Sequence, residues 1–196
     1  MRFTKNTRQI LDFIDEFRFI TAKECANIFY KGRKNPLIQA QKKLKMMCDN
    51  GVIKRKQDKF TKEYIYSFDG NVPSNHKLYL IDLYSYLYNR YEVVYFNTEE
   101  IWNISKRRND GHIIIEKDGS LIGILIEIDI NHITNKAKTD SIYNSGEVQY
   151  WYEQNFGIPY FPSFIIVNAS GKSRIHSEYY EVIATDFTLE SLCKML

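Results

Sequence analysis

Residues 35–51 read NPLIQAQKKLKMMCDNG, and this stretch predicts a helix with both of its ends marked. Asn35 is of a residue type favoured just before a helix, and Pro36 suits the first turn because its missing N–H group would have no helical partner there. Gly51 is placed to end the helix, since glycine readily adopts the left-handed conformation found after helix ends. The residues at helical spacing that are expected to face the core are Leu37, Ala40, Leu44 and Met47.

The remaining residues of this helix, and the hairpin after it, predict a surface rich in amides and cations. Strands are expected at residues 52–56 and 63–68, joined by a polar tip at residues 57–62. Lysine and arginine neutralise phosphates, and glutamine amides can bridge adenine edges in the major groove. The candidate DNA-contacting residues are Lys34, Gln39, Gln41, Lys42, Lys43, Lys45, Lys54, Arg55, Lys56, Lys59 and Lys62.

Two helices are predicted upstream of this stretch. The first spans residues 7–17 and has an apolar stripe of Ile10, Leu11, Ile14 and Phe17. The second begins at a capping box formed by Thr21 and Glu24, with Ile20 as a hydrophobic staple, and runs through about residue 30. Three helices with a basic third one, followed by a basic hairpin, resemble the winged helix-turn-helix, which implies docking on double-stranded DNA.

Charge is divided unevenly along the chain. Residues 1–75 contain 16 Lys and Arg against 8 Asp and Glu, whereas the remainder contains 11 against 16. Nucleic-acid binders concentrate positive charge on one module, so the division favours DNA binding by the first part of the chain. The alternative is that the lysines form a solvated surface and that the winged helix serves protein contacts.

The composition is 44% hydrophobic and 26% charged, which is typical of soluble globular proteins. The longest apolar run, around residues 121–126, is too short to cross a bilayer, and no apolar export segment follows the first charged residues. Cys25, Cys48 and Cys193 have neither disulfide-framework nor metal-site spacing. We therefore expect a cytoplasmic protein without a membrane partner, its cysteines reduced.

Turn-forming residues at positions 69–74 predict a boundary between a domain of residues 1–72 and a domain of residues 73–196. The second domain is expected to have the order αβββαβ, which makes the fold class α+β. This order resembles the core of the PD-(D/E)XK, or restriction-endonuclease-like, superfamily. The predicted elements are a helix at 76–91, strands at 92–96, 112–116 and 121–130, a helix at 134–155 and a strand at 163–168.

The superfamily resemblance implies roles for several acids. Asp110 stands at its first aspartate and Glu127 at its metal-binding acid. Because side chains alternate along a strand, Glu127 and Asp129 share one face, and with Asp110 they could hold Mg²⁺ or Mn²⁺. Asp129 stands where the superfamily carries a catalytic lysine. Since three unpaired carboxylates repel one another, either a metal neutralises them, one is protonated, or Lys138 replaces the missing lysine.

Two interpretations of these acids stay open. In one, the three carboxylates and Lys138 cleave DNA with a metal ion. In the other, which the lost lysine favours, the domain is an inactive scaffold in which basic side chains pair with the acids. The basic candidates are Arg107, Arg108 and Lys138. A tyrosine nucleophile is disfavoured, because relaxases that use one also need clustered histidines and the four histidines here are dispersed.

The order of the two modules carries a closer resemblance. A winged helix followed by Asp110-Gly111, by Leu125-Ile126-Glu127-Ile128-Asp129, and then by Thr134, Lys138 and Tyr143 resembles the replication-relaxation family of plasmids and conjugative elements. The resemblance spans about residues 5–170. It implies a DNA-binding accessory protein that docks at an origin and assists a relaxase or replication protein. The alternatives are a metal-dependent nuclease and a transcriptional regulator, and a homodimer is left open.

Overall fold

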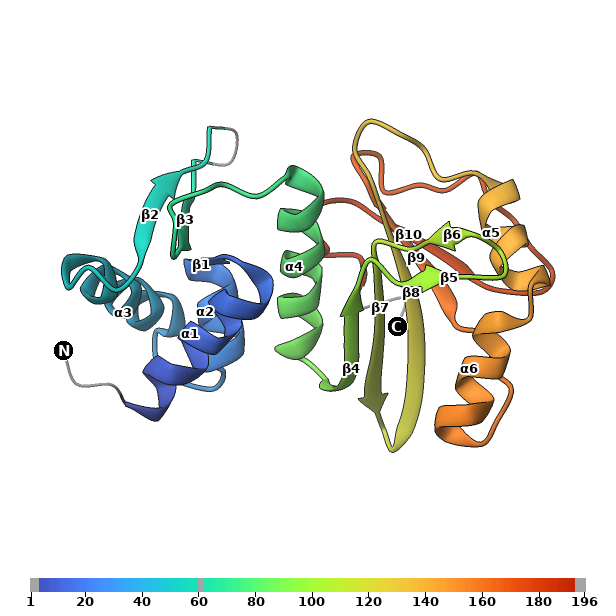
Figure 1. The fold of residues 1–196 in the computed structure, drawn as a ribbon, viewed down its shortest axis with the longest axis horizontal. Helices are drawn as coiled ribbons and strands as arrows, with labels where there is room; N and C mark the ends of the chain where they lie inside the picture. Colours follow the sequence, from blue (N-terminus) through green and yellow to red (C-terminus); the bar gives the residue numbers. More distant parts are fainter. Residues whose placement is uncertain (1–3, 60–61, 193–196) are drawn as a thin grey trace. The chain divides into compact units, whose positions relative to one another are not determined.

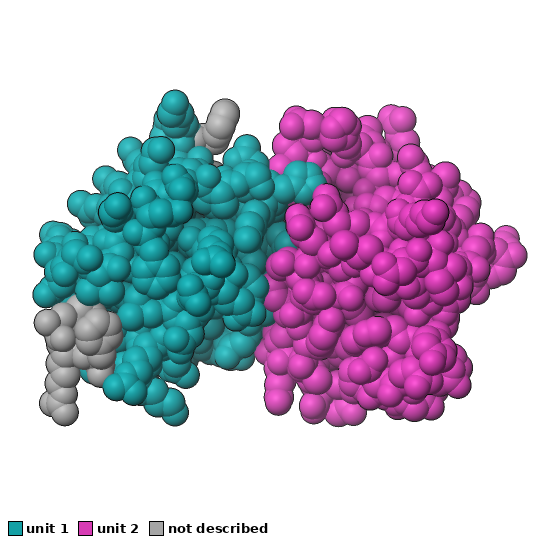
Figure 2. All heavy atoms as spheres, viewed as in Figure 1, with its two compact units in different colours: residues 1–90 teal, residues 91–196 magenta. Residues whose placement is uncertain are grey.

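The fold was analysed in a computed structural model, which describes residues 4–59 and 62–192. The chain divides into two compact units, residues 1–90 (unit 1) and residues 91–196 (unit 2), which Figure 2 colours separately. The described residues form six helices and a mixed sheet, so the fold is α+β (Figure 1). None of the described helices combines the length and apolar character needed to cross a membrane.

Unit 1 opens with three helices, as the sequence predicts. They are α1 (Lys5–Phe17), α2 (Ala22–Phe29) and α3 (Pro36–Asp49). The buried stripe of α1 includes Phe13, whereas Leu11 is only half-buried, so the expected stripe is rotated slightly. These apolar faces place the core of unit 1 between the helices.

The predicted ends of α2 and α3 are largely confirmed. The Thr21 hydroxyl accepts a hydrogen bond from the Glu24 backbone N–H, and the Glu24 carboxylate accepts one from the Thr21 backbone N–H at 2.7 Å. Pro36 occupies the first turn of α3, and Gly51 follows its end with a φ of +70°. Asn35 precedes α3 in the left-handed conformation and its side chain makes no cap bond, so its predicted capping role is wrong.

A small antiparallel sheet completes this part of unit 1. Its strands are β1 (Ile20–Thr21), β2 (Lys54–Gln57) and β3 (Tyr64–Ser67), in the order β1-β3-β2. The hairpin of β2 and β3 was predicted, although both strands are shorter than expected. Strand β1 was not predicted, because two residues are too few for a recognisable alternation.

Helix α4 (Asn75–Tyr88) belongs to unit 1, which corrects the predicted domain boundary. Lys23 of α2 donates to Asp82 of α4 at 2.8 Å, and Asn27 donates to Ser85 at 3.3 Å. The Tyr84 ring lies 5.8 Å from the Phe17 ring. The division therefore falls after residue 90 rather than after residue 72: the turn at residues 69–74 ends a strand but does not end the core.

Unit 2 is built on a five-stranded sheet with the order β10-β9-β8-β7-β4 (Figure 1). Strands β4, β7 and β8 are antiparallel neighbours, whereas β9 and β10 run parallel to β8. The strands are β4 (Glu92–Thr98), β7 (Gly111–Lys117), β8 (Ser120–Asp129), β9 (Ser163–Asn168) and β10 (Val182–Thr185). The carboxyl ends of β8 and β9 consequently lie next to each other.

Three features of unit 2 differ from the prediction. The single helix expected at residues 134–155 is two helices, α5 (Lys136–Asn144) and α6 (Glu147–Phe156), because Gly146 adopts a φ of +69° between them. A short ribbon of β5 (Ile101–Trp102) and β6 (Arg107–Arg108) was missed, and so was β10. Strands this short, or lying next to loops, leave little periodicity in a sequence.

The core of unit 2 packs α6 against the sheet. Tyr152 of α6 is 4% exposed, and its hydroxyl lies 2.8 Å from Nε2 of the fully buried His112 on β7. Gly123 of β8 faces the same hydroxyl so closely that a Cβ at this position would clash with it. Gly123 therefore allows the close approach of α6 to the sheet.

Candidate functional site

Unit 1 contains a groove of about 490 Å³ between α3, the β2–β3 hairpin and the start of α2. We call it the α3–hairpin groove. Its lining includes amide, cationic and aromatic side chains, with one carboxylate among the described residues. The lining residues are Ala22, Lys23, Leu37, Gln41, Lys45, Arg55, Lys62, Glu63, Tyr64 and Tyr66.

Helix α3 contributes one stripe to this groove. Leu37, Gln41 and Lys45 are spaced by four residues, so they lie along one face of the helix. The prediction that Leu37 faces the core is wrong, because its side chain is 45% exposed. The buried face of α3 consists of Ala40, Leu44 and Met47. The core stripe therefore begins one turn later than the sequence pattern predicted.

The hairpin contributes the opposite wall. Arg55 is the register partner of Tyr66, and side chains on one face of a strand recur at every second residue, so Arg55, Tyr64 and Tyr66 share a face. The Arg55 guanidinium lies 4.9 Å from the centre of the Tyr64 ring, which holds the cation over an aromatic face. Lys54 and Lys56 are exposed but project to the other face of β2.

Two predicted DNA contacts are engaged within the protein instead. Lys43 is half-buried and donates to the Thr7 hydroxyl at 2.5 Å, and burial lowers the pKa of its ammonium group. The Gln39 amide donates to the backbone carbonyl of Lys34 at 2.6 Å. Neither side chain lines the groove. Their placement on α3 looks as favourable in sequence as that of Gln41 and Lys45, which do line it.

The other predicted cations lie outside the groove or at its edge. Lys62 lines the groove and donates to the backbone carbonyl of Lys59 at 2.7 Å. Lys34, Lys42 and Lys59 are exposed but do not line it. Lys23, Tyr64 and Tyr66 also line the groove and were not predicted to do so. Their only signal in the sequence is their position beside the predicted wing and second helix.

In unit 2, Glu127 of β8 is the centre of a buried polar cluster. Its side chain is 3% exposed. Asn109 donates to Glu127 Oε1 at 2.6 Å, and Lys138 of α5 donates to Oε2 at 2.7 Å. Burial raises the pKa of Glu127 to about 7, although the Lys138 charge acts in the opposite direction. This contact of Lys138 is one of the three alternatives that the sequence leaves open for these acids.

Asn109 is a further member of this cluster that the sequence analysis did not single out. Its side chain is fully buried, and its Oδ1 accepts a hydrogen bond from the Trp102 indole at 2.7 Å. The amide thus connects the β5–β6 ribbon to Glu127. A buried amide with both ends bonded orients its neighbours, because each lost bond would leave a buried polar group unsatisfied.

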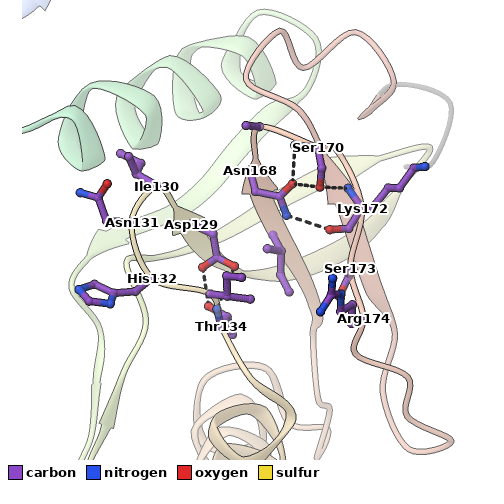
Figure 3. A pocket seen from close by; sticks show the side chains of 13 residues that line it. Asp129, Ile130, Asn131, His132, Thr134, Asn168, Ser170, Lys172, Ser173 and Arg174 are labelled. Carbon is purple, nitrogen blue, oxygen red and sulfur yellow. Dashed lines mark hydrogen bonds between the residues drawn. The ribbon is translucent and has the colours of Figure 1, made fainter.

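The other two acids also have donors of their own. Asp129 accepts bonds from the Thr134 backbone N–H at 2.9 Å and from the Thr134 hydroxyl at 2.8 Å (Figure 3). Asp110 accepts a bond from the Ile128 backbone N–H at 2.7 Å. Arg107 and Arg108, the predicted arginine partners, are exposed, and Arg108 lies 3.8 Å from Glu99.

The arrangement does not fit a divalent metal held jointly by the three acids. Within residues 4–59 and 62–192, no group of three or more His, Cys, Asp or Glu side chains is placed to hold a metal ion. Both Glu127 oxygens are bonded to Asn109 and Lys138, and both Asp129 oxygens to Thr134. The geometry thus gives the predicted Mg²⁺ or Mn²⁺ site at Asp110, Glu127 and Asp129 no support.

Comparisons of the chain with models of protein families, with characterised proteins and with solved structures gave no match.

Proposed function

We propose that unit 1 is a winged helix-turn-helix that binds duplex DNA, with α3 in the major groove and the β2–β3 hairpin against the phosphate backbone. The α3–hairpin groove carries this proposal. Lys45, Arg55 and Lys62 line it together with the Gln41 amide, against the single carboxylate of Glu63. Burial also raises the pKa of Glu63 above its ordinary value.

The groove side chains match the chemistry of duplex DNA. Gln41 can bond the N6 and N7 atoms of adenine, and the exposed Leu37 can contact a thymine methyl group. Both lie in the first two turns of α3, and the N-terminal part of a recognition helix is the part that reaches base edges. Lys45 and Arg55 would neutralise phosphates on either side.

The proposal is tested by removing the two groove cations together. Lys45→Ala combined with Arg55→Ala should weaken binding to every duplex on the order of tenfold, because two charge-assisted phosphate contacts are lost. Fluorescence anisotropy with labelled duplexes at low salt measures this. Lys54→Ala combined with Lys56→Ala removes the same charge from the opposite face of β2 and should have a smaller effect. Equal losses in both variants would contradict the assignment of the groove.

The role at an origin rests on the sequence resemblance. In this proposal the protein docks at an origin of conjugative transfer or plasmid replication, and unit 2 contacts a relaxase or replication protein. A genomic footprint of the purified protein tests the role. Protection at an origin is the expected result, whereas protection confined to promoters would make the protein a transcriptional regulator.

One observation favours the nuclease alternative, namely the contact between Lys138 and Glu127, because it brings a lysine to the expected acid. The donor set does not fit a divalent metal, so no metal-dependent step is derived. Incubation of supercoiled and single-stranded DNA with the protein and Mg²⁺ or Mn²⁺ separates the alternatives. Cleavage that is lost in Asp110→Ala would establish a nuclease in place of an accessory protein.

A further inference from the structure

Besides the α3–hairpin groove of unit 1, the protein has a cleft in unit 2, at the carboxyl ends of the neighbouring parallel strands β8 and β9. We call it the strand-end cleft. Its volume is about 370 Å³, within the range of roughly 300–1,000 Å³ of small-molecule sites. Asp129 and Asn168 end the two strands at its base, and residues 130–134 and 169–174 surround them (Figure 3). Crevices outside the carboxyl ends of parallel strands are recurrent ligand sites in α/β sheets.

One wall of the cleft is a turn held by its own hydrogen bonds. Asn168 Oδ1 accepts bonds from the Ser170 backbone N–H at 3.0 Å and from the Ser170 hydroxyl at 2.7 Å. The Asn168 amide donates to the Lys172 carbonyl at 2.9 Å (Figure 3). These bonds fix the backbone that carries Lys172, two residues before Arg174. The turn is therefore preorganised, which reduces the entropy lost when a ligand binds.

The charge available to a ligand in this cleft is positive. Lys172 and Arg174 are exposed lining residues, and neither forms an ion pair with any residue that the structure describes. Asp129 is the carboxylate of the lining, and both of its oxygens already accept bonds from Thr134. Lys172 and Arg174 lie two residues apart on this wall of the cleft, and a phosphate, with its several acceptor oxygens, is an anion that lysine and arginine side chains bind.

The rest of the lining is suited to a ring. Ile130, Ile133 and Ile166 supply apolar surface, and Ile133 is 79% exposed. His132 lies among the lining residues and offers a flat face with hydrogen-bonding nitrogens (Figure 3). An anion-binding rim beside apolar side chains and an imidazole fits a molecule that joins a phosphate to a heterocycle.

We propose that the strand-end cleft binds a nucleoside monophosphate group, with the phosphate on Lys172 and Arg174 and the base against Ile133 and His132. The group is either a free nucleotide or the 5′-phosphorylated end of a DNA strand. This site is separate from the α3–hairpin groove of unit 1 and does not depend on duplex binding there.

Isothermal titration calorimetry on the full-length protein tests the proposal with deoxyadenosine monophosphate, deoxyadenosine and inorganic phosphate. The monophosphate should bind at least about tenfold more tightly than the nucleoside, because the phosphate contacts are charge-assisted. Lys172→Ala combined with Arg174→Ala should remove this difference. Lys106→Ala, which removes an exposed cation elsewhere in unit 2, should leave it unchanged. Equal binding of nucleotide and nucleoside, or no binding of either, would overturn the proposal.

A second variant tests the location without removing a cation. Ala169 is exposed and lines the cleft, so Ala169→Glu should fold normally and should abolish nucleotide binding by placing a carboxylate beside Lys172 and Arg174. Unchanged affinity in this variant would place the nucleotide elsewhere and overturn the proposal.

The two sources of the nucleotide are distinguished with short single-stranded oligonucleotides. They are used in the Lys45→Ala and Arg55→Ala background, so that the groove of unit 1 contributes little. Tighter binding of the 5′-phosphorylated oligonucleotide than of the monophosphate would identify a strand end. Tighter binding of the monophosphate would identify a free nucleotide. Indifference to both the terminal phosphate and the free nucleotide would overturn the proposal.

Discussion

Lys43 and Lys45 lie two positions apart on α3 and carry the same charge, but their side chains lie in different surroundings. Lys43 is half-buried and bonded to Thr7, whereas Lys45 is exposed in the α3–hairpin groove. Gln39 and Gln41 are divided in the same way, by the bond of Gln39 to a backbone carbonyl. The sequence identified the helix and its polar residues. It did not separate Lys43 from Lys45, because the Thr7 hydroxyl that bonds Lys43 lies 36 residues away in sequence. It did not separate Gln39 from Gln41 either, because a bond to a backbone carbonyl leaves no signature in the sequence.

This division predicts different effects of the two glutamines on sequence preference. Gln41→Ala should reduce discrimination between the preferred duplex and one with an altered A·T pair by about 1–3 kcal/mol, because an amide contact to a base edge is lost. Gln39→Ala should leave discrimination unchanged. Competition binding with a panel of single-substitution duplexes measures both. A larger loss of preference in Gln39→Ala than in Gln41→Ala would be incompatible with the groove described here.

The buried cluster of unit 2 was partly foreseen. A contact of Lys138 with the acids is one of the three alternatives that the sequence leaves open, and Lys138 does contact Glu127, which lies 11 residues earlier on another element. The contribution of Asn109 and Trp102 was not foreseen. Asparagine and tryptophan carry no signal in the sequence that marks them as partners of an acid. Only the three-dimensional arrangement shows that Trp102 and Asn109 form a chain of hydrogen bonds to Glu127.

The cluster predicts a pH dependence of stability. The pKa of Glu127 in the folded protein, about 7, lies above its ordinary value of 4.5, so the folded state holds this proton more tightly than the unfolded state. The free energy of unfolding should therefore fall by roughly 3 kcal/mol as the pH rises from about 4.5 to 7. In Lys138→Met the pKa rises further, because the nearby positive charge is removed, and the fall should extend to higher pH.

Urea unfolding followed by tryptophan fluorescence measures this effect in unit 2, since Trp102 and Trp151 are the two tryptophans of the chain. Glu127→Gln should remove most of the dependence over this pH range. Lys106→Met serves as the control for loss of a lysine charge. Identical pH profiles for the wild type and Lys138→Met would show that Lys138 does not govern the ionisation of Glu127.

At the scale of elements, helices were predicted better than short strands. The start of α2 follows from its capping box, and the ends of α3 follow from Pro36 and Gly51, which act locally. The break between α5 and α6 was missed, although Gly146 marks it, because apolar spacing continued across the glycine. The β5–β6 ribbon and β10 were missed because β5 and β6 are two residues long and β10 is four. These segments are strands because they pair with neighbouring strands, and their own residues show no alternation long enough to predict this.

The packing of α6 on the sheet predicts a large effect of a small change. Gly123→Ala should lower the free energy of unfolding by about 1–3 kcal/mol, because the added methyl group would collide with the buried Tyr152 hydroxyl. Combining it with Tyr152→Phe should recover part of this loss beyond the sum of the single effects. Denaturant unfolding of the four proteins of this cycle measures the coupling. Simple additivity would contradict a direct clash between these positions.

At the scale of the whole molecule, two units were expected and two are found, but the boundary moved from residue 72 to residue 90. The turn-forming residues at positions 69–74 predict the end of a domain there, whereas the side chains of α4 continue the core of unit 1. An apolar helix can serve either of two neighbouring cores. Its sequence does not say which, since this depends on the complementary faces of helices such as α2.

The central claim is that the cations of the α3–hairpin groove neutralise DNA phosphates. The salt dependence of duplex affinity tests it most directly, because each phosphate contact adds about 0.9 to the slope of log affinity against log salt concentration. The wild type should show a steep decrease with salt. Lys45→Ala combined with Arg55→Ala should reduce the slope by about 2. A wild-type affinity indifferent to salt, or a slope unchanged in the double variant, would contradict the account.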